Sequence, residues 1–179
     1  MGQSLRCVEC SCSAPALLWQ EGRGSELLQV YDATFASPSK PTEASGIMSG
    51  YNTLGALPYI AIAMRDAGRD AEADALLNAA RSSITAGNSD MLRVDRQVAL
   101  ARGNALLGKR EGALDNLLQA RPNGWPGTMP LFASISIIPI ENDPAFVALR
   151  GLPEFVSLAQ EISRETARER AEYSASAGR

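Results

Sequence analysis

The chain has 179 residues, of which 45% are apolar and 6% aromatic, and its formal net charge is −3. This length predicts one domain, with a core built mainly from Ala and Leu. The negative charge argues against a nucleic-acid-binding surface, which requires a basic face, and gives no reason to expect an anionic membrane as a partner. No apolar run approaches the roughly 20 residues of a membrane-spanning helix. The N-terminus lacks the apolar stretch of a secretory signal, so we expect a cytoplasmic protein.

Three cysteines are crowded into the sequence CVECSC near the N-terminus, and they allow three interpretations. A structural zinc site would use Cys7, Cys10 and Cys12, but zinc usually takes four Cys or His ligands and the chain contains no His. The spacing of Cys7 and Cys10 also allows a redox pair, although no βαβ pattern surrounds it. We favour a reduced terminus without a metal or redox role, since short polar termini are usually poorly ordered. Residues 1–45 are therefore expected to be partly disordered, and no metal or cofactor is predicted.

Two segments, 54–87 and 94–127, repeat each other with an offset of 40 residues when Gly68 is aligned with Gly108. Apolar and small residues recur at three- and four-residue steps on both sides of each glycine, as on one face of a helix. Small residues at these steps allow two helix axes to approach to about 8–10 Å. Self-similarity at a period of about 20–50 residues indicates a stacked array of helix pairs within 46–127. The aligned pairs are Ile60 with Leu100, Ala61 with Ala101, Ala73 with Ala113, Leu77 with Leu117, and Ala80 with Ala120.

A weaker third copy precedes these two. The segment 14–36 places Gly22 and Tyr31 at the steps of Gly68 and Leu77, and we expect it to form one degenerate helix pair. A polar connector rich in Pro and Ser follows at 36–46. The next helix contains Pro58, and proline is tolerated only in the first turn of a helix. The helix therefore either begins near Leu57 or kinks there, and we favour a start close to Gly55.

The repeated positions resemble the tetratricopeptide repeat (TPR), a helix-turn-helix unit of about 34 residues. In that family a large and a small residue in the first helix precede a turn glycine, and Ala, a bulky residue and Ala follow in the second. Leu57 and Met64, and then Gln97 and Asn104, stand where the family has aromatic residues. The family's closing proline is absent. The longer period requires about six extra residues, which we place near 88–93.

The TPR resemblance implies an all-α fold, namely a short TPR-like α-solenoid of antiparallel helix pairs with a C-terminal capping helix. It also implies that first-helix residues off the packing stripe line a groove for a peptide or a partner domain. These groove positions are Ile62, Arg65, Asp66, Val98, Arg102 and Leu106. The alternative for the two arginines is an ordinary exposed side chain. Family members that hold a chaperone's C-terminal carboxylate use Lys and Asn at the positions of Pro58 and Ile62, so we expect no such clamp.

The C-terminal region, 128–173, is expected to hold an irregular proline-rich segment followed by capping helices. Asp143 can cap a short helix that begins at Pro144, and Pro153 opens a last helix whose outer face is polar, as a terminal repeat requires. We expect 174–179 to be a disordered tail. The inward positions of the last helix are Phe155, Leu158, Ala159 and Ile162.

The run DPAFVALRGLPEF resembles the tails of bacterial TPR proteins in which the repeats follow a winged-helix regulator or an adenylate cyclase. This second resemblance implies an alternative function, a C-terminal sensory or interaction fragment of such a protein whose effector domain is missing.

Catalytic patterns are not found in the sequence. The absence of His excludes a His-based general base, and no phosphate-binding glycine loop is present. The acidic cluster of Asp70, Glu72 and Asp74 opens a helix, where carboxylates stabilise the dipole. We therefore predict a non-catalytic protein–protein interaction scaffold, and rank an enzyme third.

Overall fold

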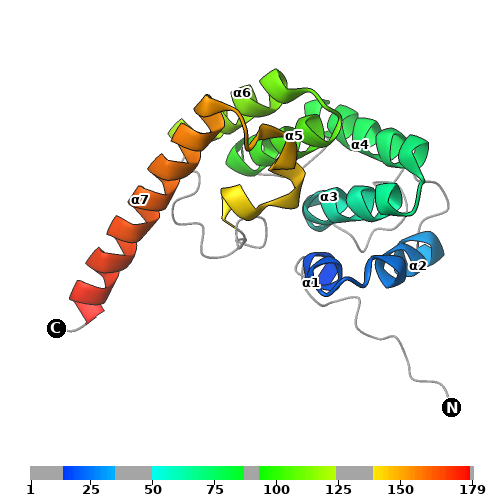
Figure 1. The fold of residues 1–179 in the computed structure, drawn as a ribbon, viewed down its shortest axis with the longest axis horizontal. Coiled ribbons are helices and arrows are strands. Elements are labelled where there is room, and N and C mark those ends of the chain that lie inside the picture. Colours follow the sequence, from blue (N-terminus) through cyan, green and yellow to red (C-terminus); the bar gives the residue numbers. More distant parts are fainter. Residues whose placement is uncertain (1–13, 35–49, 87–92, 124–138, 178–179) are drawn as a thin grey trace, which may run out of the picture. The chain divides into compact units, whose positions relative to one another are not determined.

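The computed structural model describes residues 14–34, 50–86, 93–123 and 139–177 (Figure 1). Every regular element in these residues is a helix, which confirms the all-α expectation. The chain divides into two compact units, Met1–Met91 and Leu92–Arg179, and the boundary falls between the two sequence copies. The predictions for the three cysteines, for the connector at 36–46 and for most of the insertion near 88–93 lie outside the described residues. So do residues 128–138 of the predicted irregular segment.

The first unit contains four helices in its described residues: α1 (Ala14–Gln20), α2 (Gly24–Thr34), α3 (Gly50–Asp66) and α4 (Asp70–Thr85). Helix α3 contacts the other three and lies between the α1–α2 pair and α4 (Figure 1). The rings of Trp19 on α1 and Tyr59 on α3 meet at a centroid distance of 6.0 Å. The predicted packing stripes are buried, namely Leu57, Ala61, Met64, Ala73, Leu77, Ala80 and Ile84.

The expected start of α3 near Gly55 is wrong, because the helix begins at Gly50 and continues through Pro58. Proline has no N–H for the carbonyl of Leu54, and its ring crowds that carbonyl. Pro58 is nevertheless buried between the buried residues Leu57 and Tyr59. Burial of each such apolar side chain contributes about 1.5–3 kcal/mol, which offsets the cost of the lost hydrogen bond.

The second unit contains α5 (Arg93–Leu106) and α6 (Arg110–Ala120), which contact each other extensively. Within the described parts of 121–152, three short 3₁₀ helices follow, η1 (Arg121–Asn123), η3 (Ile140–Asn142) and η4 (Pro144–Leu149), before the long helix α7 (Pro153–Ala177). Helix η4 packs on α5, and the rings of Phe146 on η4 and Phe155 on α7 meet at 5.9 Å. The buried residues of the second copy include Ala101, Ala113, Leu117 and Ala120, as predicted.

The three helix-turn-helix connections have the same backbone conformation. Gly22, Gly68 and Gly108 have φ angles of 72°, 74° and 73°. In each turn the glycine N–H donates to the carbonyl three residues earlier and the next N–H donates to the carbonyl five residues earlier, at 2.8–3.1 Å. This pair of bonds is the Schellman motif, which satisfies carbonyls at the end of a helix and favours glycine because its φ is positive. The residue after each glycine, Arg23, Arg69 or Lys109, then accepts the first hydrogen bond of the next helix.

The C-terminal elements follow the sequence prediction closely except at the end of α7. The Asp143 side chain caps η4 by accepting from the Ala145 N–H, and Phe155, Leu158 and Ile162 are buried. The expected tail from residue 174 is wrong in part, because α7 continues to Ala177. No helix-breaking residue occurs before Gly178, and the Ser176 hydroxyl donates to the carbonyl of Tyr173 at 2.7 Å.

The neighbouring residues Leu117 and Leu118 provide a matched test of the packing, since they are 0% and 49% exposed. We expect Leu117→Ala to lower the free energy of unfolding by about 2–5 kcal/mol, because it leaves a cavity between helices. The control Leu118→Ala should change it by less than about 0.5 kcal/mol. Urea unfolding measures both, and similar losses for the two variants would contradict the burial described above.

Gly108 and Gly103 provide a second matched test, because a Cβ added at either position meets no atom within 4 Å beyond the adjacent residues and the backbone of its own helix. Gly108→Ala should destabilise by about 1–2 kcal/mol, since its positive φ disfavours any side chain. Gly103→Ala, in the interior of α5, should stabilise by about 0.5–1 kcal/mol through lower backbone entropy in the unfolded chain. Thermal unfolding decides the sign of each change, and a stabilising Gly108→Ala would rule out the described turn.

Candidate interaction surfaces

The three predicted groove residues of the first unit lie on one face of α3. Ile62 and Arg65 are half-buried and Asp66 is exposed. The Arg65 guanidinium lies 2.7 Å from the carboxylate of Asp74, near the start of α4. Arg65 therefore braces the two helices, and its charge is offset by a carboxylate of the same chain.

The predicted groove residues of the second unit are placed differently. Val98 and Arg102 are 2% and 3% exposed, so the expectation that they line an open groove is wrong. Leu106 is half-buried. The first helix of this unit turns Val98 and Arg102 toward its own core, because η4 packs on α5.

Arg102 and Asp143 form a buried ion pair. The Arg102 Nε and Nη2 atoms each lie 2.7 Å from Asp143 Oδ2, and the Ala145 N–H donates to Oδ1 at 3.0 Å. Both carboxylate oxygens are therefore engaged, one by the guanidinium and the other by the first turn of η4. Sequence analysis identified Asp143 as a cap but missed its partner, because the two residues are 41 positions apart and no local pattern connects them.

A hydrogen-bonded set of amides joins α5 to α6. Asn116 donates to Gln97 at 2.7 Å and accepts from Asn104 at 2.9 Å, and all three side chains are half-buried. The residues 40 positions earlier are Leu76, Leu57 and Met64, all of which are buried. The two copies thus place polar and apolar triads at equivalent positions.

A cluster of charges surrounds the turn between α3 and α4. Arg69 donates to both oxygens of Asp32 on α2 at 2.9–3.0 Å and to both oxygens of Glu72 at 2.8–2.9 Å. The hydrogen bonds from Arg69 lower the pKa of Glu72. Nearby, burial raises the pKa of Tyr31 to about 12, and the charge of Asp32 adds to this effect. The cluster holds α2 against the α3–α4 turn, although exposed ion pairs of this kind usually stabilise weakly.

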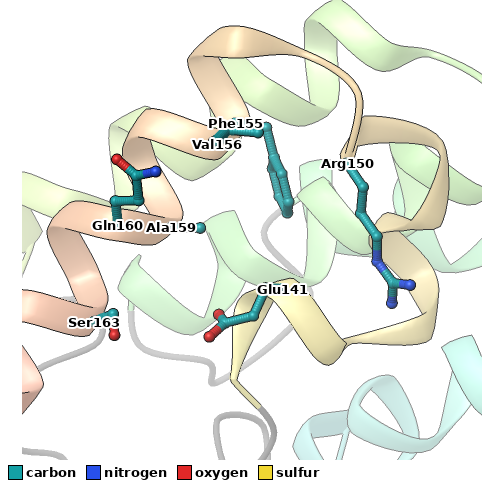
Figure 2. Close-up of a pocket in the computed structure, with 7 residues that line it drawn as sticks. All are labelled: Glu141, Arg150, Phe155, Val156, Ala159, Gln160 and Ser163. Atoms are coloured by element: carbon teal, nitrogen blue, oxygen red, sulfur yellow. The ribbon is translucent and has the colours of Figure 1, made fainter.

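A cleft of about 340 Å³ lies between the N-terminal half of α7 and the short helices η3 and η4 (Figure 2). Its lining is mainly apolar where α7 forms the wall, with charged side chains from η3 and from the end of η4. The sequence does not predict this cleft, because its lining residues come from separate elements. The lining residues are Glu141, Arg150, Phe155, Val156, Ala159, Gln160 and Ser163.

Within the described residues, no three His, Cys, Asp or Glu side chains are grouped so as to hold a metal ion. The helices of the same residues include none with the length and apolar character needed to cross a bilayer. Comparisons with protein-family models, with curated proteins and with solved structures gave no match to this chain.

The Arg102–Asp143 pair is testable through the neutral variant Asp143→Asn, which can still cap η4 through its amide oxygen. We expect a loss of about 3–5 kcal/mol in the free energy of unfolding, because Arg102 would keep a buried charge without a counterion. The exposed neighbour variant Glu141→Gln is the control and should change stability by less than about 0.5 kcal/mol.

The double variant Arg102→Met with Asp143→Asn should recover part of this loss, since it removes the uncompensated charge. Urea unfolding of the wild type, Arg102→Met, Asp143→Asn and the double variant gives the coupling between the two residues. Independent, additive losses would show that the pair does not act as one unit.

Proposed function

We propose that this chain is a non-catalytic interaction scaffold of the TPR type, which binds a segment of a partner protein on the first-helix face of its repeats. The observation that carries the proposal is the recurrence of one turn. Gly22, Gly68 and Gly108 have the same positive φ and the same Schellman hydrogen bonds, and each follows a helix and precedes another. Three turns that share this φ angle and this hydrogen-bond pattern support a repeated helix-turn-helix unit.

Polar contacts support an antiparallel pairing within each repeat. Arg65, late in α3, pairs with Asp74, early in α4. In the second unit, Asn104 near the end of α5 lies close to Gly112 in the first turn of α6, because a Cβ added at Gly112 would be 3.4 Å from its Nδ2. Gln97, seven residues earlier, hydrogen-bonds Asn116, four residues later. A first helix and a second helix that meet both near the turn and far from it run in opposite directions, as a TPR-like solenoid requires.

Because two of the predicted groove residues in the second unit are buried, we restrict the proposed binding face to the first unit. Val98 and Arg102 are buried, whereas Ile62 is half-buried and Asp66 is exposed. An apolar side chain beside a carboxylate is complementary to a segment that carries an apolar residue next to a basic one. In such interfaces a few partly buried side chains provide most of the affinity and surrounding charges provide selectivity.

The regulator or cyclase alternative rests on the run at 143–155, and the positions of these residues explain the run without it. Asp143 caps η4 and neutralises Arg102, while Phe146, Leu149 and Phe155 are buried. The motif therefore follows from the stability of the second unit. The alternative stays a prediction, and we base the proposal on the scaffold alone.

Site-specific photo-crosslinking of the full chain tests the proposal. A photoreactive residue at Ile62 or Asp66 should give a discrete covalent adduct with a protein in cell extract, because these positions lie on the proposed binding face. The control position is Ala75, which is exposed on the second helix of the same repeat and should give no such adduct. The proposal fails if positions 62 and 66 give no adduct, or if position 75 gives the same one.

A further inference from the structure

The cleft of the second unit has one wall of low polarity and one carboxylate that nothing else in the described residues engages. Phe155, Val156 and Ala159 form the apolar wall on α7. Val156 is 41% exposed, so part of this wall is open to solvent. Figure 2 shows the Glu141 carboxylate on the opposite side, extending toward the end of the cleft where Ser163 lies.

The two charged residues of the cleft, Arg150 and Glu141, differ in their hydrogen bonds to the rest of the chain. The Arg150 guanidinium donates to the backbone carbonyl of Asp143 at 3.4 Å and lies at the other end of the cleft from Ser163 (Figure 2). For Glu141, no hydrogen bond or ion pair to its carboxylate occurs among the described residues. Glu141 is exposed to solvent, and no side chain of the described residues offsets its charge, so a cation is the complementary group at this end of the cleft.

From these contacts we infer that the cleft is a second binding site, which accepts a Lys or Arg side chain from an apolar segment of a partner protein. The aliphatic stem of such a side chain lies along Val156 and Ala159, and its charged head reaches the Glu141 carboxylate. Long basic side chains bury their methylene groups in this way while keeping the charge in a polar setting. Flanking apolar residues of the partner cover the exposed part of Val156. The Ser163 hydroxyl provides a further acceptor for the ammonium or guanidinium group.

This site goes beyond the proposed function and is independent of it. All seven lining residues belong to the second unit, whereas the proposed binding face lies on α3 of the first unit. If Ile62 and Asp66 gave no crosslinks, the inference about the cleft would still stand. If the cleft bound no peptide, the proposed function would still stand.

The test is a titration of the full, isotope-labelled chain with two capped peptides, acetyl-Leu-Lys-Leu-amide and acetyl-Leu-Glu-Leu-amide. The changes in the amide chemical shifts of the protein are measured by NMR. We expect the Lys peptide to shift the resonances of Ala159, Gln160 and Ser163 with a dissociation constant of the order of 1 mM, as one side chain and one ion pair provide. Glu141→Gln should weaken this binding roughly threefold to fivefold. The matched control is Glu154→Gln, which neutralises an exposed carboxylate on the first turn of α7 outside the cleft and should leave the binding unchanged.

A charge reversal keeps the test decisive if neutralisation has a small effect. Glu141→Lys should make the Glu peptide the better ligand, and circular dichroism checks that each variant is folded. Equal shifts with both peptides, shifts outside the cleft, or no shift at all would overturn the inference. So would an unchanged affinity in Glu141→Gln, or a loss in Glu154→Gln as large as in Glu141→Gln. Shifts of the same resonances on raising the protein concentration alone would also overturn it, because the occupant would then be a second copy of this chain.

Discussion

A buried ion pair determines how the C-terminal elements attach to the second repeat. Removing a guanidinium and a carboxylate from water costs several kcal/mol for each ion, and mutual attraction repays this only when the remaining hydrogen-bonding groups are also satisfied. Asp143 meets that condition by using one oxygen for Arg102 and the other for the Ala145 N–H. The pair therefore links α5 and the first turn of η4 through one carboxylate. The adjacent contact between Phe146 and Phe155 extends this attachment to α7.

The position of the ion pair also shapes what the molecule can bind. In the sequence, Arg102 occupies the place of a groove residue, and its charge would suit a partner with acidic groups. Its burial against Asp143 removes that charge from the surface. Among the described residues, the two surfaces that we propose for binding are the α3 face of the first unit and the cleft beside α7 in the second. Both combine apolar surface with a carboxylate, Asp66 in one case and Glu141 in the other.

Features governed by local rules could be predicted from the sequence. Apolar periodicity and the glycines at 68 and 108 located the helices and turns, since a Schellman turn needs a residue that adopts positive φ. Pro58 could not be judged in this way, because its tolerance depends on the tertiary burial of α3. Arg102 was misplaced for a similar reason, as its partner is distant in sequence. The cleft forms only where η3, the end of η4 and α7 meet, and sequence periodicity does not predict how such elements pack against each other.

The amide triad of Gln97, Asn104 and Asn116 has a consequence for how a nearly duplicated chain avoids folding onto itself incorrectly. If α5 paired with α4, the amides of Gln97 and Asn104 would face Leu76. If α3 paired with α6, the amide of Asn116 would face Leu57 and Met64. A buried amide left without a partner costs about 1–3 kcal/mol, and these half-buried amides would lose part of that amount. The contact between the two helices is thus apolar in the first copy and polar in the second, and the two kinds of surface do not suit each other. The residues that stabilise each correct helix pair therefore also disfavour the exchange of helices between the two similar copies.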